Sequence, residues 1–326
     1  MNQPMFWMGG RFATDLVEIS HEPSCLDDGD FWAVSTTFEG AFTAAKFATV
    51  VEADFPDAAW SPIKSQWHSV PNEEDYIAYV ERIRELIAQG WVYQVNACRR
   101  ITTDDSNANL RGLFKGILNN NPAPWASYLE IPNLNIASAS PELFLQRSGS
   151  RVKTSPIKGT QLLGSSEFGV KDQSENIMIV DLMRNDLGKI CKSGTVEVSR
   201  LLYSQDHPGL QHLVSDVEGD LLSGISWSNI LDSIAPPGSV SGAPKSSAVS
   251  VIAEHEKPRG PYCGILGWVQ GDQAQLSVAI RIFWKDEEIH FGTGAGITFS
   301  SQSQAEWDET ELKASRLIKI AAGQIS

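Results

Sequence analysis

The chain has 326 residues, of which 42% are hydrophobic, and its 10 Trp and 13 Phe supply enough apolar surface for a sizeable core. Its formal net charge of −14 excludes the clustered positive surface that nucleic acids and anionic membranes require. The four cysteines are widely separated and have no metal-ligand spacing.

No run approaches the ~18 apolar residues of a membrane span. The start, Met1–Gly10, also lacks the basic segment of an export signal. We therefore expect a globular, cytoplasmic protein with neither a nucleic-acid nor a membrane partner.

The first predicted elements are β-strands. Phe31–Phe38 and Ala41–Val51 are strand-like runs, and turn residues lie around them, so residues 1–70 are expected to form a short β-rich segment packed on the core. Asn72 predicts the start of a helix with an acidic first turn, and Gly90 predicts its end.

Strand-like runs then dominate the chain. Several follow one another without an intervening helix, which favours an α+β fold with antiparallel sheets over a βαβ repeat. The predicted strands are Val92–Ile101, Ala126–Ile131, Leu143–Gln146, Val196–Tyr203, Leu213–Val217, Gly264–Val269 and Gln275–Phe283.

Three later helices are predicted. The first runs from Asp172 to Leu187 and is expected to end at Gly188. The second begins near Pro244, a residue suited to a first helical turn, and ends before Pro258. The last runs from Ser303 to Gly323, and its first residues have the spacing of a capping box.

Two acidic pairs occur at helical spacing. Glu306 and Glu309 share one helix face with Lys313, and Asp172 and Glu175 repeat the same separation on another helix. Each pair alone is compatible with a solvated surface, where Glu306 closes the cap and Glu309 pairs with Lys313. Together they supply the hard oxygen ligands that Mg²⁺ prefers, so a cation site is the alternative.

Lys158 is the candidate nucleophile. It lies between Pro156 and the pair Gly159-Thr160, which could let a ligand approach the backbone. An ordinary exposed turn is the alternative, because most lysines are solvated. Glu142 precedes the apolar run Leu143–Leu145, where burial would raise its pKa toward that of a general acid.

A glycine-rich run and an arginine complete the candidate site. Gly292–Gly296 could be a tight strand exit or could present backbone N–H groups to a carboxylate. Arg281 follows an apolar run and should not be buried unpaired. We expect a carboxylate partner, from the protein or from a ligand with equal weight.

The order of the motifs resembles the chorismate-utilising enzymes, most closely the aminodeoxychorismate synthase branch. That branch commonly has Lys in the PIKGT block where anthranilate synthases have Ala, so Lys158 favours it. The resemblance covers about Tyr76 to Ile320. It rests on SASPELFL at Ser138, PIKGT at Pro156, ENIMIVDLMRNDLG at Glu175, QHLVSDVEG at Gln211, PPGSVSGAPK at Pro236, RGPYCGILG at Arg259, AIR at Ala279 and GAGITFSSQSQAEWDET at Gly294.

The resemblance implies the chorismate-utilising-enzyme fold, with large antiparallel β-sheets packed face to face and helices outside. It makes Lys158 the amine that attacks C2 of chorismate and Glu142 the acid that protonates the departing C4 hydroxyl. The implied Mg²⁺ ligands are Glu175, Glu306 and Glu309, with Asp172 close by through water. The implied substrate-binding residues are Gly159, Thr160, His212, Tyr262, Arg281, Lys313, Gln94 and the N–H groups of Gly294 and Gly296.

The implied reaction is Mg²⁺-dependent amination of chorismate at C4, giving 4-amino-4-deoxychorismate for p-aminobenzoate and folate synthesis. Ammonia would come from a separate glutaminase subunit. Isochorismate and salicylate synthases have a water-activating lysine at the position of Gln94, which disfavours water as the nucleophile here. The alternatives are anthranilate synthase component I and a non-catalytic chorismate-binding subunit.

The chain departs from the family pattern in places. The family usually continues PIKGT with Arg-Pro-Arg-Gly, whereas this chain has Gln161–Gly164, and Ile282 replaces a frequent Thr. Residues 1–70 form a shorter N-terminal segment than in typical members, so we expect no complete tryptophan site. Residues 71–326 are expected to form the chorismate-binding catalytic domain.

Overall fold

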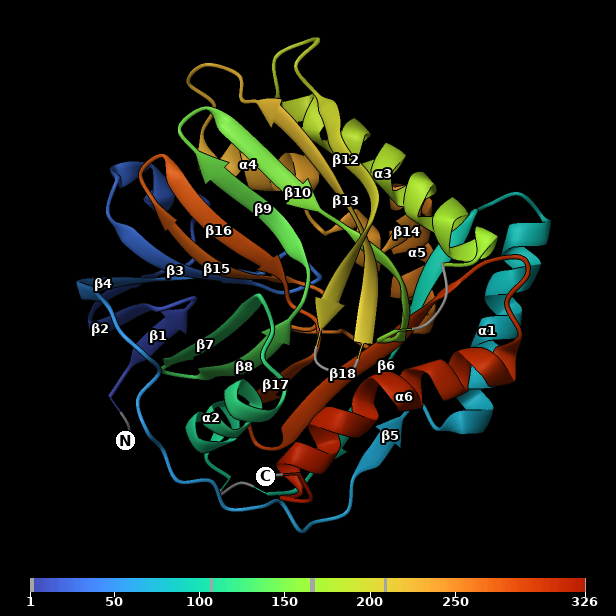
Figure 1. Ribbon diagram of the computed structural model, residues 1–326, viewed down its shortest axis with the longest axis horizontal. Helices are drawn as coiled ribbons and strands as arrows, with labels where there is room; N and C mark the ends of the chain where they lie inside the picture. Colours follow the sequence, from blue (N-terminus) through green and yellow to red (C-terminus); the bar gives the residue numbers. More distant parts are fainter. Residues whose placement is uncertain (1–2, 106–107, 165–167, 208–209, 326) are drawn as a thin grey trace.

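The computed structural model describes residues 3–105, 108–164, 168–207 and 210–325. Its strands join into one strongly curled sheet of 18 strands, in which every strand pairing between the named strands is antiparallel (Figure 1). Helices cover the outside of this sheet. The predicted α+β architecture with antiparallel strands is therefore confirmed.

The strands are distributed along the whole chain. They are β1 (Met5–Met8), β2 (Arg11–Ser20), β3 (Phe31–Thr36), β4 (Phe42–Glu52), β5 (His68–Val70), β6 (Gln94–Thr103), β7 (Trp125–Ile131), β8 (Leu134–Ser140), β9 (Leu143–Ser148), β10 (Arg151–Ser155), β11 (Ile157–Leu162), β12 (Glu197–His207), β13 (Leu210–Asp220), β14 (Gly242–Ala243), β15 (Ile265–Gln270), β16 (Gln273–Val278), β17 (Ile282–Lys285) and β18 (Ile289–Ile297).

The described ranges also contain six α-helices and two 3₁₀ turns. They are η1 (Pro23–Asp28), α1 (Glu73–Ala88), α2 (Leu110–Asn120), α3 (Val170–Ile190), α4 (Trp227–Ile234), η2 (Gly238–Val240), α5 (Lys245–His255) and α6 (Ser303–Ala321). No helix among these residues is long and apolar enough to cross a membrane.

The first strands belong to the same sheet as the later ones. β1 pairs with β7, placing Phe6 opposite Leu129, and β3 pairs with β15, placing Val34 opposite Gly267. These pairings bury Phe6 and Val34 completely. The N-terminal strands are thus held by ladder hydrogen bonds and by the hydrophobic effect together.

Helix α1 forms as predicted. Asn72 is its N-cap, and its side-chain oxygen accepts a hydrogen bond from the Asp75 backbone N–H at 2.9 Å. The predicted end of α3 at Gly188 is wrong, because this helix continues to Ile190. Leu187 and Ile190 are buried in the core, and their burial outweighs the modest cost of a glycine within a helix.

One predicted strand is interrupted. The run Gln275–Phe283 forms the end of β16 and the start of β17, with a break at Arg281, whose φ of +53° lies in the left-handed region. β16 pairs with β9 whereas β17 pairs with β8, so the chain must change direction between the two partners. The alternation of apolar residues gave no sign of this break.

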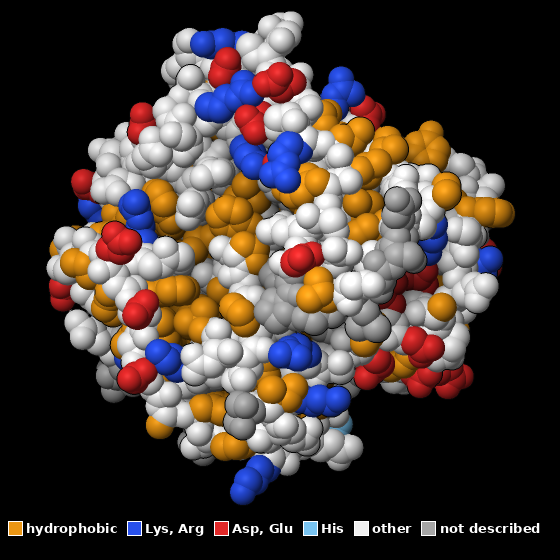
Figure 2. All heavy atoms as spheres, viewed as in Figure 1, with side chains coloured by type: hydrophobic (Ala, Val, Ile, Leu, Met, Phe, Trp, Pro, Cys, Tyr) orange, Lys and Arg blue, Asp and Glu red, His pale blue; other side chains and the backbone are white. Residues whose placement is uncertain are grey.

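The N-terminal turns of two helices lie close together, because Lys171 of α3 is 3.9 Å from Glu306 of α6. α6 packs along β18, and α3 packs along β13 and β11. Acidic side chains gather on the surface over α6, toward the lower right of the view (Figure 2). The candidate site lies between these two helices and the strands beneath them.

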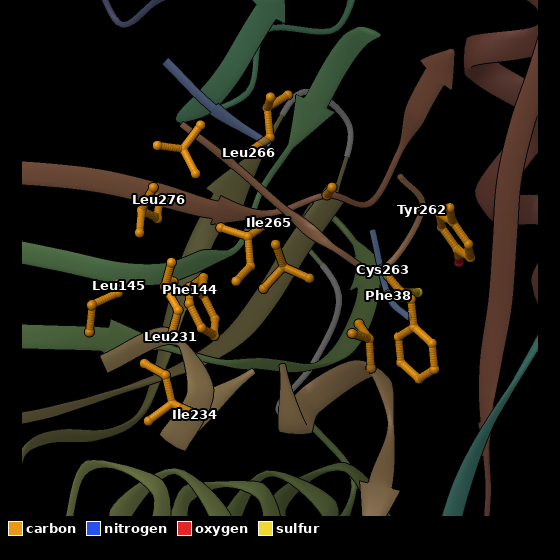
Figure 3. Close-up of a cluster of buried hydrophobic side chains, with 14 of the residues drawn as sticks. Phe38, Phe144, Leu145, Leu231, Ile234, Tyr262, Cys263, Ile265, Leu266 and Leu276 are labelled. Carbon is orange, nitrogen blue, oxygen red and sulfur yellow. The ribbon is translucent and has the colours of Figure 1, made fainter. Parts of the chain in front are cut away.

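A large buried cluster supports the strands that carry the site. Figure 3 shows Phe144 of β9, Leu231 of α4 and Ile265 of β15 in this cluster, with Tyr262 and Cys263 at one side. All five side chains are buried. Cys98, Cys191 and Cys263 are buried, free thiols, and Cys25 is partly exposed.

Candidate active site

Lys158 lies on β11, where the register with β13 shifts between Ile157 and Thr160. Its Nζ donates a hydrogen bond to the Ser239 carbonyl oxygen at 2.9 Å. Desolvation lowers the pKa of the Lys158 amine, and the nearby Lys313 ammonium lowers it further, against the opposing effect of Glu142. The alternative of an ordinary exposed turn is therefore not what forms: the amine points inward, where desolvation disfavours its charged form.

Gly159 allows this arrangement. Its φ is +88°, and a Cβ there would lie 3.0 Å from the Asp172 Cβ and 3.2 Å from the Phe168 ring. Both the backbone conformation and the close approach of α3 therefore require glycine. The backbone of Thr160 lies opposite His212 on β13, and the Thr160 side chain is outside the described part of the structure.

Glu142 is the buried acid expected from the sequence. Its side chain is only 4% exposed. Burial raises its pKa from 4.5 to about 7, although the Ser239 hydroxyl, the Lys158 ammonium and the Ile157 amide partly oppose the shift. At neutral pH a substantial fraction of Glu142 is protonated, as a general acid requires.

The raised pKa of Glu142 predicts a pH-dependent stability. Burial of the neutral acid contributes stability that is present below pH 4.5 and is lost as the pH rises through about 7. We expect wild-type protein to lose about 1–3 kcal/mol more stability between about pH 5 and about pH 8 than Glu142→Gln, which cannot ionise. Denaturant unfolding at the two pH values measures this difference, and equal losses would contradict the assignment.

Sequence reasoning missed Ser239. Its carbonyl contacts the Lys158 amine and its hydroxyl contacts Glu142, so one residue joins the candidate nucleophile to the candidate acid. The PPGSVSGAPK block was the available signal, but no residue within it was singled out. Two cations hold this segment: the partly buried Lys245 pairs with Asp186 at 2.5 Å, and the buried Arg259 donates to the Val240 carbonyl at 2.9 Å.

Glu175 on α3 faces Glu306 and Glu309 on α6, whereas Asp172 packs against Gly159. Glu306 is only 4% exposed, so the solvated alternative is wrong for it. The predicted capping box is also wrong, because the N-cap of α6 is Gln302 and makes no side-chain cap bond. Burial raises the pKa of both Glu175 and Glu306, and nearby acidic groups add to this effect.

Glu309 is more exposed and is paired as predicted. Lys313 lies 2.6 Å from its carboxylate and also donates to the Gly294 carbonyl at 3.0 Å. This ion pair lowers the pKa of Glu309. Lys158 interacts electrostatically with Glu175 and Glu309, so the amine and the acidic groups belong to one site.

The acidic side chains are not closed around a ready metal position. Among the residues that the structure describes, no three His, Cys, Asp or Glu side chains are close enough to hold a metal ion. Lys171 instead lies between Glu175 and Glu306, at 3.8 and 3.9 Å. The Oε1 atom of Glu175 is buried and has no hydrogen-bond partner, which fits a divalent cation at this position.

Arg281 has no acidic partner among the described residues. The one hydrogen bond of its side chain in the described part of the structure runs between Nη2 and the His212 Nε2 atom, at 3.3 Å. Desolvation lowers the pKa of Arg281 to about 10. Of the two expected partners, a protein carboxylate is therefore excluded within this part of the chain, which favours an anionic ligand.

Gln94 supplies a second unsatisfied polar group. Its side chain is 1% exposed, and neither its amide nitrogen nor its amide oxygen has a hydrogen-bond partner. A Cβ on Gly296 would overlap the Gln94 amide and lie 3.6 Å from the Lys158 Nζ. The Gln94 amide and the Lys158 amine thus both lie next to Gly296, where a ligand could form hydrogen bonds with both.

The backbone of Gly294 faces away from its neighbour strand. Gly294 lies opposite Cys98, but the Cys98 N–H donates to Glu256 and the Gly294 carbonyl accepts from Lys313. The N–H of a strand residue lies on the same edge as its carbonyl, so the Gly294 N–H also faces the site. Tyr262 packs its ring where a Cβ on Gly292 would lie and is 6% exposed.

Comparison with known proteins identifies a family and similar sequences for this chain. Residues 31–319 match the chorismate binding enzyme family. The chain is 34% identical over 273 residues to anthranilate synthase component 1 of Aquifex aeolicus, covering 79% of this chain and 55% of that protein. It is 32% identical over 256 residues to aminodeoxychorismate synthase component 1 of Bacillus subtilis, covering 74% of this chain and 54% of that protein. The chain spans about half the length of these two curated relatives.

Two solved structures share the fold. MenF, the menaquinone-specific isochorismate synthase of Escherichia coli, superposes with a TM-score of 0.83 at 18% identity, covering 98% of this chain and 88% of that one. Anthranilate synthase component I of Streptococcus pneumoniae gives 0.81 at 21% identity, with coverages of 98% and 91%. The expected chorismate-utilising-enzyme fold is therefore confirmed.

Proposed function

Because the chain belongs to the chorismate binding enzyme family, we propose that it is an aminodeoxychorismate synthase that replaces the C4 hydroxyl of chorismate with ammonia. The observation that carries the proposal is the Lys158 amine, whose pKa is lowered by desolvation and which shares Ser239 with the acid Glu142. This pairing provides a nucleophile and a proton donor at one site.

The proposed reaction has two steps. The neutral Lys158 amine attacks C2, the ring double bond shifts, and the C4 hydroxyl leaves as water with the proton of Glu142. Ammonia then attacks C4, the double bond shifts back, and the C2–nitrogen bond breaks to restore the Lys158 amine. The carboxylate of Glu142 takes the proton that the incoming ammonia loses, so the enzyme returns to its initial state.

Both charged groups of the substrate have candidate partners. Glu175, Glu306 and Glu309, with Asp172 nearby, would hold a Mg²⁺ ion, which would neutralise a substrate carboxylate. Arg281 and the Gly294 N–H would bind the second carboxylate, because Arg281 otherwise lacks an anionic partner in the described structure. Gln94 would donate or accept a hydrogen bond at the ring.

The role of Arg281 gives a prediction. Arg281→Lys should raise the KM for chorismate by about tenfold, with a smaller change in kcat, because lysine cannot reproduce bidentate carboxylate binding. Steady-state kinetics at saturating ammonium measures both constants. Arg184→Lys, an exposed position on α3 paired with Asp181, is the control and should match wild type. An unchanged KM in Arg281→Lys would exclude this carboxylate contact.

The second candidate is anthranilate synthase component I, the name carried by several of the similar proteins. In that reaction ammonia adds at C2, a position that Lys158 would occupy here. Purified protein with chorismate, Mg²⁺ and ammonium distinguishes the two by product mass and fluorescence. We expect 4-amino-4-deoxychorismate, and anthranilate as the main product would reject the proposal. Chorismate binding without turnover would instead favour the non-catalytic alternative.

The ammonia is proposed to come from a separate glutaminase subunit. Similar proteins are named component 1, which implies a second component for them. None of the four cysteines of this chain lies in the Gly-x-Cys-x-Gly context of a class I glutaminase nucleophile. Glutamine should therefore support turnover only after the partner is added, whereas ammonium should support it alone.

A further inference from the structure

Lys171 lies in the first turn of α3 and contacts carboxylates on two helices. Its Nζ is 3.8 Å from Oε1 of Glu175, on its own helix, and 3.9 Å from Oε1 of Glu306 on α6. The Lys171 side chain is 55% exposed, whereas those of Glu175 and Glu306 are 17% and 5% exposed. One exposed ammonium therefore balances two largely buried carboxylates.

The contact is electrostatic and loose. Both distances exceed the range of a hydrogen bond, and Oε1 of Glu175 has no hydrogen-bond partner in the described structure. Glu309 differs, because Lys313 binds it at 2.6 Å and is itself held by the Gly294 carbonyl. Lys171 can consequently leave its carboxylates without breaking a directional bond, whereas Lys313 cannot.

The position of Lys171 is unfavourable for a structural lysine. A positive charge in the first turn of a helix is repelled by the helix dipole, which favours acidic residues there. Lysine N-terminal to glutamate at i and i+4 is also the weaker orientation of such a pair. The two carboxylates offset this unfavourable position of the Lys171 charge. Their stabilising effect on Lys171 is lost when another cation neutralises them.

We propose that Lys171 is a tethered counter-ion, which neutralises Glu175 and Glu306 in the metal-free protein and is displaced into solvent when a divalent cation binds. The proposal rests on the Mg²⁺ site of the proposed function. It assigns Lys171 a defined role: the lysine prevents repulsion between α3 and α6 without metal, and it weakens metal binding by competing for the same oxygen atoms.

Cation titration tests this without any turnover. Mg²⁺ binding is measured by calorimetry, and Mn²⁺ binding by loss of the electron paramagnetic resonance signal of the free ion. Lys171→Gln should bind both ions about three- to tenfold more tightly than wild type, because the competitor is removed. Lys171→Arg retains the charge and should remain within about twofold of wild type.

Lys189→Gln is the matched control. It makes the same change of charge on the same helix, where Lys189 pairs with Asp186 at 3.0 Å, and it should leave the affinity unchanged. Titrations in about 0.5 M salt screen long-range effects of net charge. Without divalent ions, Lys171→Gln should also melt at a lower temperature than wild type, and saturating Mg²⁺ should remove the difference.

The outcomes separate two failures. If wild type and Lys171→Gln bind the ions with equal affinity, or if the variant binds more weakly, Lys171 is not a competitor, while the proposed amination is unaffected. If neither protein binds a divalent cation, the counter-ion role and the metal site both fail. If Lys189→Gln tightens cation binding to the same extent, the effect arises from net charge alone, and the proposal is overturned.

Discussion

Replacing Lys158 with alanine is expected to reduce the formation of 4-amino-4-deoxychorismate by roughly 10³-fold, because the covalent step loses its nucleophile. With the amine absent, C2 of chorismate is open to ammonia, so the residual product should shift toward anthranilate. Product analysis by mass, with chorismate, Mg²⁺ and ammonium, measures rate and regiochemistry together.

A trapping experiment tests the same step directly. Wild-type protein incubated with chorismate and Mg²⁺, but without ammonium, should gain the mass of chorismate minus one water on the peptide that contains Lys158. Lys158→Ala should gain none. Lys192→Ala, which changes an exposed lysine after α3, controls for the loss of a lysine and should behave as wild type. An unaltered rate and product in Lys158→Ala would remove the covalent step from the mechanism.

Glu142→Gln should lower kcat by about 10²- to 10⁴-fold with little change in the KM for chorismate, because the amide keeps the shape but cannot donate an acidic proton. Glu142→Asp keeps the acid and should retain part of the activity. Comparable losses in both variants would show that the position tolerates no change and would not support proton donation. A wild-type rate in Glu142→Gln would exclude proton donation by Glu142.

The pH profile of wild type supplies an independent check. In the proposed mechanism Glu142 must be protonated, and its pKa is about 7, so kcat/KM should fall as the pH rises above this value. Lys158 must be neutral, so activity should also fall at low pH, where the amine is protonated. The alkaline limb should be absent from the residual activity of Glu142→Gln. If the alkaline limb persists in Glu142→Gln, it arises from the titration of another group.

Much of the fold follows from local sequence signals. The Asn72 side chain caps the helix by accepting a hydrogen bond from the backbone N–H of Asp75, only three residues away, so the local sequence predicts this cap. The failures depend on distant partners: Gly188 stays helical because Leu187 and Ile190 are buried, and the break at Arg281 arises because β16 and β17 pair with different strands. Such constraints are invisible to a window of neighbouring residues.

The residues of the candidate site also differ in whether the local sequence predicts them. Lys158 and Glu142 were predictable because proline, glycine and apolar neighbours mark their immediate surroundings. Lys171 and Ser239 were not, since the importance of each comes from contacts between segments far apart in the chain. The metal ligands remain a prediction: the structure brings Glu175 and Glu306 near a common cation, and that cation is a lysine.

Ser239 has a consequence for how this protein could change during evolution. Because the same residue contacts the amine on β11 and the acid that precedes β9, a displacement of its loop moves both contacts together. The candidate proton donor and the candidate nucleophile are thereby coupled through one segment. Substitutions that release this segment, such as those at Lys245 or Arg259, should impair both proposed chemical roles at once, although neither residue contacts Lys158 or Glu142 in the proposed mechanism.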